Sequence, residues 1–96
     1  MRYDFQAEVW LYSGEAAWHF VTLPAELTDS LKTMGRRSKG WGSMRVKATI
    51  GETSWRTSLF PDSRSSAFLL PLKADVRRRA NIRAGDWLAL SVELEL

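Results

Sequence analysis

The chain has 96 residues, which is enough for one domain and too few for two, and 45% of them are hydrophobic. We therefore expect a single packed domain over 1–96 rather than disorder. The absence of cysteine excludes disulfides, thiolate zinc sites, iron–sulfur clusters and cysteine nucleophiles. The first residues alternate in polarity, and no stretch approaches the roughly 20 apolar residues of a membrane span. We expect a cytoplasmic protein without membrane contact.

The first third of the chain predicts a hairpin followed by a helix. Residues 3–11 alternate between apolar and polar side chains, which is typical of a strand with one buried face. A turn at 13–14 leads into a second strand over 17–23. Pro24 suits the first turn of a helix, where its missing N–H needs no partner. Gly35 is expected to end that helix.

The rest of the chain predicts four strands and a second helix. The strands are expected over 44–50, 53–60, 67–70 and 88–96. A basic, glycine-rich loop over 35–43 precedes the first of them, and a turn at 51–52 follows it. The second helix is expected over 72–80. Asn81 suits its end, because asparagine tolerates the left-handed conformation.

These elements favour a mainly β fold, a small six-stranded, mostly antiparallel β-barrel with two short helices. Five tryptophans are expected to supply much of its core. The segments 20–24 and 68–71 both run from a strand through Leu-Pro into a helix. This echo indicates either a two-fold pseudo-repeat or chance, because Leu-Pro is a common way to begin a helix.

Short motifs in a specific order occur at residues 18–24, 42–51, 55–61, 70–77 and 85–86. Together they resemble a bacterial family known only as domain of unknown function nineteen-oh-five. The resemblance implies a double-split barrel related to the AbrB-like swapped-hairpin proteins. Leu70-Pro71, Arg77 and Gly85-Asp86 are similar to the signature of those DNA-binding barrels.

The chain departs from that family's usual pattern at two places. Asn81 stands where the family usually has glycine, a mild change because asparagine also adopts positive φ. Residues 63–66 stand where the family has a glycine-rich loop, so no role is carried over to this loop. The family has no assigned function, and the resemblance therefore implies a fold but no activity.

Catalytic chemistry has little support in the sequence. His19 is the single histidine, and a zinc site needs several ligands. No serine lies in a Gly-x-Ser-x-Gly elbow, no phosphate-loop motif occurs, and the carboxylates form no paired constellation. We expect a domain that is not an enzyme and that holds no metal and no cofactor.

A candidate binding strand runs over 55–61. Arg56 and Ser58 share one of its faces and suit an anion, with an aromatic wall from Trp41 or Trp55. The alternative is that Trp55 belongs to the core while Arg56 is merely a surface residue. The candidate binding residues are Trp41, Arg45, Trp55, Arg56, Ser58, Lys73 and Arg77.

Positive charge is concentrated in the middle of the chain, because residues 32–83 hold thirteen Lys and Arg against three acids. If the fold brings the basic clusters onto one face, they suit a phosphate backbone. The candidate phosphate contacts are Arg36, Arg37, Lys39 and Arg78. The alternatives are a solvated surface and a structural ion pair between Arg77 and Asp86.

Two functions follow from these observations. The first is a non-catalytic ligand- or protein-binding module, and the second is a nucleic-acid-binding barrel of the AbrB-like type that uses the basic middle segment. A homodimer is a further expectation, because the edge strands of a small split barrel need cover.

Overall fold

The computed structural model describes residues 2–14, 17–37, 43–62 and 64–95, and of residues 34–37 it describes the backbone. Its elements in chain order are β1 (Arg2–Glu8), β2 (Trp10–Leu11), β3 (His19–Thr22), α1 (Ala25–Arg37), β4 (Met44–Ile50), β5 (Thr53–Pro61), β6 (Phe68–Pro71), α2 (Ala74–Ala80) and β7 (Trp87–Leu94).

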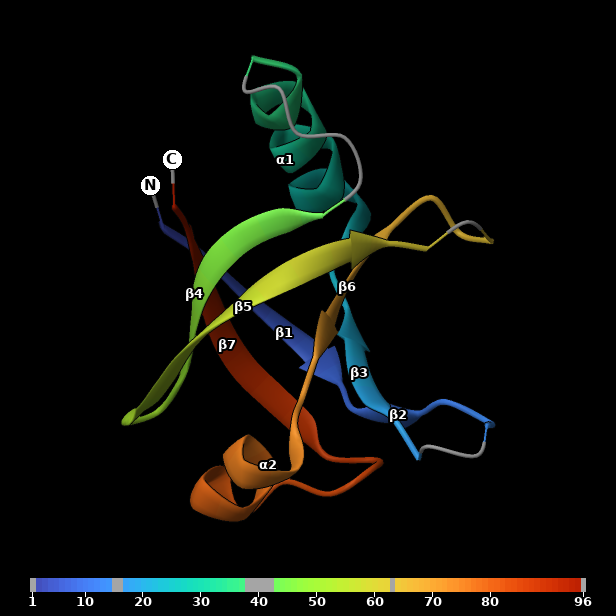
Figure 1. Cartoon of the computed structure of the whole chain (residues 1–96), viewed down its shortest axis with the longest axis vertical. Coiled ribbons are helices and arrows are strands. Elements are labelled where there is room, and N and C mark those ends of the chain that lie inside the picture. The colour runs from blue at the N-terminus through green and yellow to red at the C-terminus, as the bar shows by residue number, and fades with distance from the viewer. Residues whose placement is uncertain (1, 15–16, 38–42, 63, 96) are drawn as a thin grey trace.

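The strands form one antiparallel sheet in the order β1-β7-β4-β5-β6-β3-β2, which curls into a half-barrel (Figure 1). The prediction of a mainly β, antiparallel fold with two short helices is confirmed. The predictions of six strands and of a closed barrel are wrong, because the described residues form seven strands and the sheet keeps two edges.

The additional strand arises where the predicted strand 3–11 divides at Val9. The Val9 N–H donates to the carbonyl of Asp86, and its own carbonyl accepts from the N–H of Gly85, both at 2.8 Å. These bonds tie Val9 to the turn before β7, so the chain stops pairing with β7 and begins to pair with β3. The two edge strands, β1 and β2, are therefore consecutive parts of one segment.

The core lies on the concave side of the sheet and is mostly aliphatic, with Phe68 as the one aromatic member among the buried described residues. Val46, Leu59, Leu70 and Val92 are fully buried there, each from a different strand. The prediction of a tryptophan-rich core is wrong, because Trp18 is 50% exposed and Trp87 is 66% exposed, and the other two described tryptophans are partly buried. A half-barrel this small is filled by side chains of valine and leucine size, and tryptophan is rarely buried completely.

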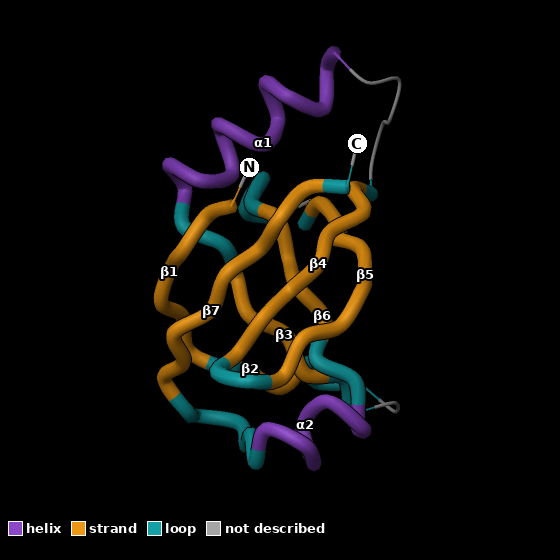
Figure 2. The backbone as a smooth tube through the Cα atoms, turned by 90° about the vertical axis from the view of Figure 1, so that its left-hand side faces the viewer, coloured by secondary structure: helices purple, strands orange, loops and turns teal. Residues whose placement is uncertain are grey.

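The two helices lie at opposite ends of the half-barrel (Figures 1 and 2). In α1, Leu31 and Thr28 are buried, while the helix projects beyond the strands at its C-terminal end (Figure 2). The prediction that Gly35 ends α1 is wrong, since the helix continues to Arg37. A glycine inside a helix costs only about 1 kcal/mol relative to alanine, which weakens a helix without ending it.

The second helix begins at Ala74 rather than at Leu72. Leu72 instead continues the pairing of β6, because its N–H donates to the carbonyl of His19 at 2.9 Å. Asn81 ends α2 as predicted, with φ 56° and ψ 54°, and its N–H bonds to carbonyls of the last turn. Neither α1 nor α2, the helices of the described ranges, is long and apolar enough to cross a membrane.

The order of elements repeats. Three strands and a helix occur twice, as β1-β2-β3-α1 and β4-β5-β6-α2, and β7 follows alone. The Leu-Pro echo lies at the same place in both units, at the ends of β3 and β6. These strands pair antiparallel, with Val21 opposite Leu70, so they lead into helices at opposite ends. Such an arrangement is that of a local two-fold axis between β3 and β6.

Candidate functional site

The outward side chains on the convex face of the sheet differ in polarity from one strand to the next. On β4, buried apolar residues that point inward alternate with exposed polar residues that point outward. On β3 and β6 the alternation is lost, and apolar side chains also point outward. A strand that is apolar on both faces is typical of one covered on both faces. The outward side of β2 and β3 is therefore where a binding surface is expected.

Four aromatic side chains gather there around Phe20, and we call Trp10, Tyr12, Trp18 and Phe20 the aromatic face. The ring of Trp18 stacks on Phe20 with centroids 5.9 Å apart and an angle of 13°. Trp10 lies 5.2 Å from Phe20, and Tyr12 meets it edge-on at 6.4 Å. Trp18 and Tyr12 remain 50% and 44% exposed. The outer rings of this cluster thus lie open to solvent.

The rings are held by polar contacts as well as by stacking. The indole Nε1 of Trp10 donates to Thr22 Oγ1 at 2.9 Å. The backbone N–H of Tyr12 donates to the carbonyl of Trp18 at 2.7 Å, and this bond extends the pairing of β2 with β3 toward the loop that joins them. An aromatic pair contributes about 0.5–1.5 kcal/mol beyond its buried area. The aromatic face is therefore a fixed surface.

A small hollow of about 190 Å³ lies beside the aromatic face, between β3 and α2. We call it the aromatic–basic groove. Its lining residues are Ala17, Trp18, His19, Pro71, Leu72, Lys73, Ala74 and Arg77. Trp18 belongs to both surfaces and therefore joins the groove to the aromatic face.

Hydrogen bonds fix the walls of the groove. The guanidinium Nε of Arg77 donates to the carbonyl of Leu72 at 3.0 Å, which holds its charged end beside the start of α2. Ala17 has φ 49°, a conformation unusual for alanine, and its carbonyl lies 2.9 Å from Nδ1 of His19. A carbonyl only accepts, so Nδ1 carries the proton and Nε2 of the neutral ring is left as an acceptor.

The groove is positively charged. Lys73 is exposed and Arg77 is half-buried, and the last turn of α2 also carries Arg78 and Arg79. The predicted ion pair between Arg77 and Asp86 does not form, because Asp86 Oδ2 accepts the backbone N–H of Arg83 at 2.8 Å and Arg77 Nε bonds to Leu72. Two cations beside an exposed indole suit an anionic group attached to an apolar one.

Of the candidate binding residues, Lys73 and Arg77 come together in the groove. Arg56 lies on the convex face of β5, where its Nε is 3.0 Å from Glu95 Oε1. Ser58 shares that face and accepts from Arg45 Nη1 at 3.4 Å. Trp55 points to the concave side, and its buried Nε1 has no hydrogen-bond partner among the described residues. It therefore does not form an aromatic wall beside Arg56.

Of the candidate phosphate contacts, the structure describes the side chain of Arg78 alone. Arg78 is exposed on α2, at one end of the half-barrel, whereas α1 and the start of β4 lie at the other end (Figures 1 and 2). Arg36 and Arg37 belong to α1, but their side chains lie outside the described residues. Lys39 and Trp41 also lie outside them. Within the described ranges, no group of three or more His, Asp or Glu residues is placed to hold a metal ion.

Both the groove and the aromatic face fall within a region that matches a known family. Residues 5–92 match the family model described as domain of unknown function DUF1905. The chain belongs to the DUF1905 family. This confirms the family resemblance of the sequence, and the AbrB-like relationship remains a prediction. A comparison with curated proteins found no match.

The aromatic face of this DUF1905 domain was not among the candidate sites predicted from the sequence. Its signal was present in residues 18–23, where Trp18, Phe20, Val21 and Leu23 place apolar side chains at both even and odd positions. A strand with one buried face is apolar at every second position, so apolar residues at both kinds of position indicate a second face that also makes contacts. Trp18 and Phe20 lie on that second face.

Proposed function

We propose that this DUF1905 domain is a non-catalytic protein-binding module that docks an acidic, partly apolar segment of a partner protein. The observation that carries the proposal is the position of Trp18. Its half-exposed ring forms part of the aromatic face and also lines the groove that holds Lys73 and Arg77. A partner can therefore place an apolar side chain on the ring and an adjacent carboxylate beside the two cations.

The size of the groove favours a side chain of a larger partner over a free small molecule. Its volume of about 190 Å³ is below the roughly 300–1,000 Å³ typical of small-molecule sites. Tryptophan and arginine are also the residues that most often dominate the energy of protein–protein interfaces. Exposed apolar patches on soluble domains commonly mark such interfaces.

The test is a selection of random peptides displayed on phage against the full chain. We expect enriched peptides to combine aspartate or glutamate with an aromatic or aliphatic residue. Trp18→Ala should weaken binding of the best synthetic peptide at least about tenfold, which corresponds to loss of one interface anchor. Trp87→Ala is the matched control, because Trp87 is also exposed but lies on β7.

Three results would overturn the proposal. The first is a selection without acidic peptides. The second is equal binding by the wild type and Trp18→Ala. The third is self-association, measured by sedimentation, that disappears in Trp18→Ala, since the occupant of the surface would then be a second copy of the chain.

The cytoplasmic location expected from the sequence stays a prediction.

A nucleic-acid-binding role is the second candidate, and the charge of α2 favours it. Three arginines occupy the last turn of this helix, and one of them, Arg77, lines the groove together with Trp18. The AbrB-like signature at Leu70-Pro71, Arg77 and Gly85-Asp86 supports the same proposal. Cations on phosphates combined with aromatic stacking are the usual means of binding nucleic acid chains.

Salt titration distinguishes this candidate from the first. Binding of duplex DNA should fall steeply between 50 mM and 200 mM salt, by about 10³-fold if six phosphates are contacted. The double variant Arg78→Ala/Arg79→Ala should weaken it, as should the triple variant Arg36→Ala/Arg37→Ala/Lys39→Ala. Absent or salt-insensitive binding would remove the candidate.

A further inference from the structure

A second hollow, of about 490 Å³, lies on the convex face above β7 and is separate from the aromatic–basic groove. It forms because β4 pairs with β7 only from Val46 to Thr49 and then turns away at Gly51. β7 continues beyond that point to Trp87, and along the hollow it carries the small side chains of Ala89 and Ser91 outward. We call this hollow the β7 furrow.

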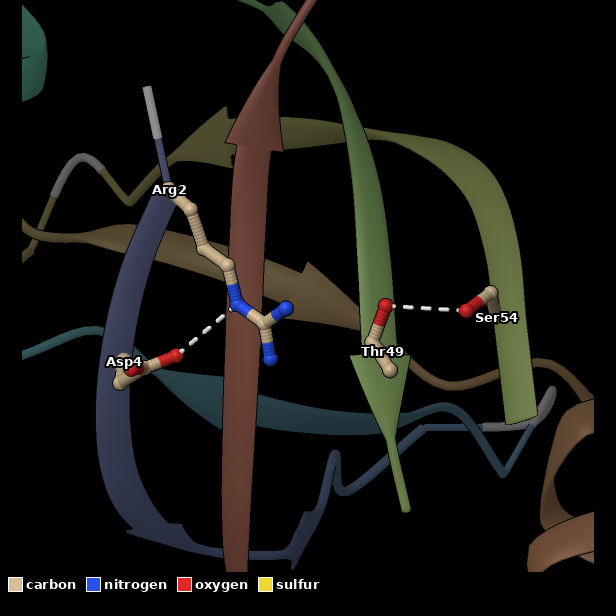
Figure 3. A network of polar contacts seen from close by, with 4 residues as sticks. All are labelled: Arg2, Asp4, Thr49 and Ser54. Carbon is tan, nitrogen blue, oxygen red and sulfur yellow. Dashed lines mark hydrogen bonds and ion pairs between the residues drawn. The ribbon is translucent and has the colours of Figure 1, made fainter. Parts of the chain in front are cut away.

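Polar groups from β1, β7 and β4 line the furrow, and Ser54 of β5 lies next to one of them. The strand register places Asp4, Ser91, Thr49 and Ser54 in one row across β1, β7, β4 and β5. The hydroxyls of Thr49 and Ser54 are 3.0 Å apart. Figure 3 shows the guanidinium of Arg2 reaching across β7, with its Nε donating to Asp4 Oδ1 at 3.2 Å. The row therefore offers both donors and acceptors.

Ser91 offers an unused hydroxyl group in this row. The residue is 5% exposed and lines the furrow, and its hydroxyl makes no hydrogen bond with the described residues. Among those residues only Trp55 Nε1 is a buried side-chain polar atom without a partner, so the Ser91 hydroxyl is in reach of water in the furrow. A ligand with its own hydroxyl groups can replace that water and bond to Ser91.

An aromatic ring lies just beyond the residues that line the furrow. Trp87 lies two residues from Ala89 on the same face of β7 and is 66% exposed. Its Nε1 donates to Gln6 Oε1 at 3.1 Å, and Gln6 also lines the furrow. The bond fixes the indole while leaving its ring open. An exposed, oriented indole beside hydroxyl, amide and carboxylate groups suits a ring that is apolar on its face and polar at its edge.

The charges in the furrow favour a neutral ligand. Arg2 and Asp4 neutralise each other through their ion pair, and no other charged side chain lines the described part of the furrow. We therefore propose that the β7 furrow binds a neutral saccharide. One sugar ring stacks on Trp87, and the hydroxyl groups of the sugar bond to Ser91, Asp4 and Arg2. The volume is within the range of about 300–1,000 Å³ typical of small-molecule sites.

The experiment probes an array of neutral and acidic oligosaccharides with the full chain, followed by NMR titration with maltose and with cellobiose. We expect binding to neutral glycans and a shift of the Trp87 indole resonance. Trp87→Ala should weaken binding about tenfold, in line with the loss of a stacked ring. Ser91→Ala should weaken it about threefold or more, as one hydrogen bond is lost. Trp18→Ala is the matched control and should leave saccharide binding unchanged.

The proposal is overturned if no neutral glycan binds at millimolar concentration. It is also overturned if only acidic glycans bind, or if Trp18→Ala weakens binding as much as Trp87→Ala. Thermal unfolding of each variant checks that it is folded, and Ser91→Ala keeps the test decisive if Trp87→Ala does not fold. Failure of the acidic-peptide experiment leaves this result unaffected, because the two sites share no lining residue.

Discussion

The two halves of the sheet share one core but present opposite surfaces. In the half made of β1, β7, β4 and β5, outward residues are mostly charged or hydroxyl-bearing, as in the row from Asp4 to Ser54. In the half made of β6, β3 and β2, outward residues are aromatic or aliphatic, as in Trp10 and Phe20. Where apolar and polar residues alternate along a strand, the apolar residues identify its inner face. Where this alternation is lost, the strand has a second face that makes contacts.

The largest effects should come from the shared core and should be equal in the two halves. Leu59 on β5 and Leu70 on β6 are both fully buried. Leu59→Ala and Leu70→Ala should each lower the free energy of unfolding by about 2–5 kcal/mol, through lost burial and a cavity. Urea unfolding followed by circular dichroism measures both changes. Phe60→Ala, at an exposed position between them, is the control with a small effect.

This prediction also tests whether the halves unfold together. One core implies a single transition for each variant. Two separated unfolding transitions, or a loss of stability confined to the half that carries the substitution, would show that the half-barrel consists of two independent units. This result would contradict the statement that the two halves share one core.

The next largest effect concerns binding and should be confined to one surface. The double variant Lys73→Ala/Arg77→Ala should weaken binding of the selected acidic peptide about tenfold at low salt, and less as salt rises, because exposed charges are screened. Isothermal titration calorimetry measures the peptide affinity and its dependence on salt. Arg45→Ala/Lys47→Ala removes the same charge from the convex face of β4 and should leave peptide affinity unchanged. An equal loss in this control would mean that net charge, not the groove, attracts the peptide.

A smaller effect separates hydroxyls that the fold uses from one that it leaves free. Thr22 accepts the indole N–H of Trp10, so Thr22→Val should cost about 1 kcal/mol of unfolding free energy. Ser91 has no such bond among the described residues, so Ser91→Ala should change stability by no more than about 0.5 kcal/mol. A large loss in Ser91→Ala, measured by urea unfolding, would assign this hydroxyl a structural role.

The smallest expected effect on stability concerns the loop between β5 and β6, which is one of the connections between the two halves. The backbone N–H of Arg64, and then the hydroxyl of Ser65, bond to the carboxylate of Asp62 and hold its pKa below the ordinary value of 3.8. Because the carboxylate is bonded in the folded state, its charged form stabilises the fold at pH values above 3.8. This contribution to stability is lost as the pH falls through the lower pKa of the folded state.

The test of this loop compares the wild type with Asp62→Asn. The variant should unfold at slightly lower temperature near neutral pH, and the two melting temperatures should converge in strong acid. A constant difference at every pH would contradict the role of the carboxylate charge.

Local signals in the sequence predicted local structure well. The hairpin of β4 and β5 turns at Gly51, with φ 56°, and α2 ends at Asn81, because such turns depend on one residue's backbone freedom. The division at Val9 was not predicted, since it depends on bonds to Asp86 and Gly85 more than 70 positions away.

The site was predictable only in part. Lys73 and Arg77 were identified by charge alone, and they do line one hollow. The aromatic wall of the hollow is Trp18, which directly precedes β3 and lies 55 positions before Lys73. The alternation of apolar and polar residues does not show which strands are neighbours, so this contact could not be predicted. Trp55 was suggested as an aromatic wall beside Arg56, but neighbouring residues of a strand point to opposite faces, and Trp55 points to the concave side.

The position of β7 has a consequence for how the chain folds during synthesis. β7 follows the other described strands in the chain, yet it lies between β1 and β4 and pairs with both, joining Arg2 to Glu93. Until β7 has left the ribosome, β1 lacks the neighbour with which it pairs and stays separate from β4 and β5. Folding of this domain should therefore wait for the synthesis of β7, and removal of residues 87–96 should prevent folding rather than shorten the sheet.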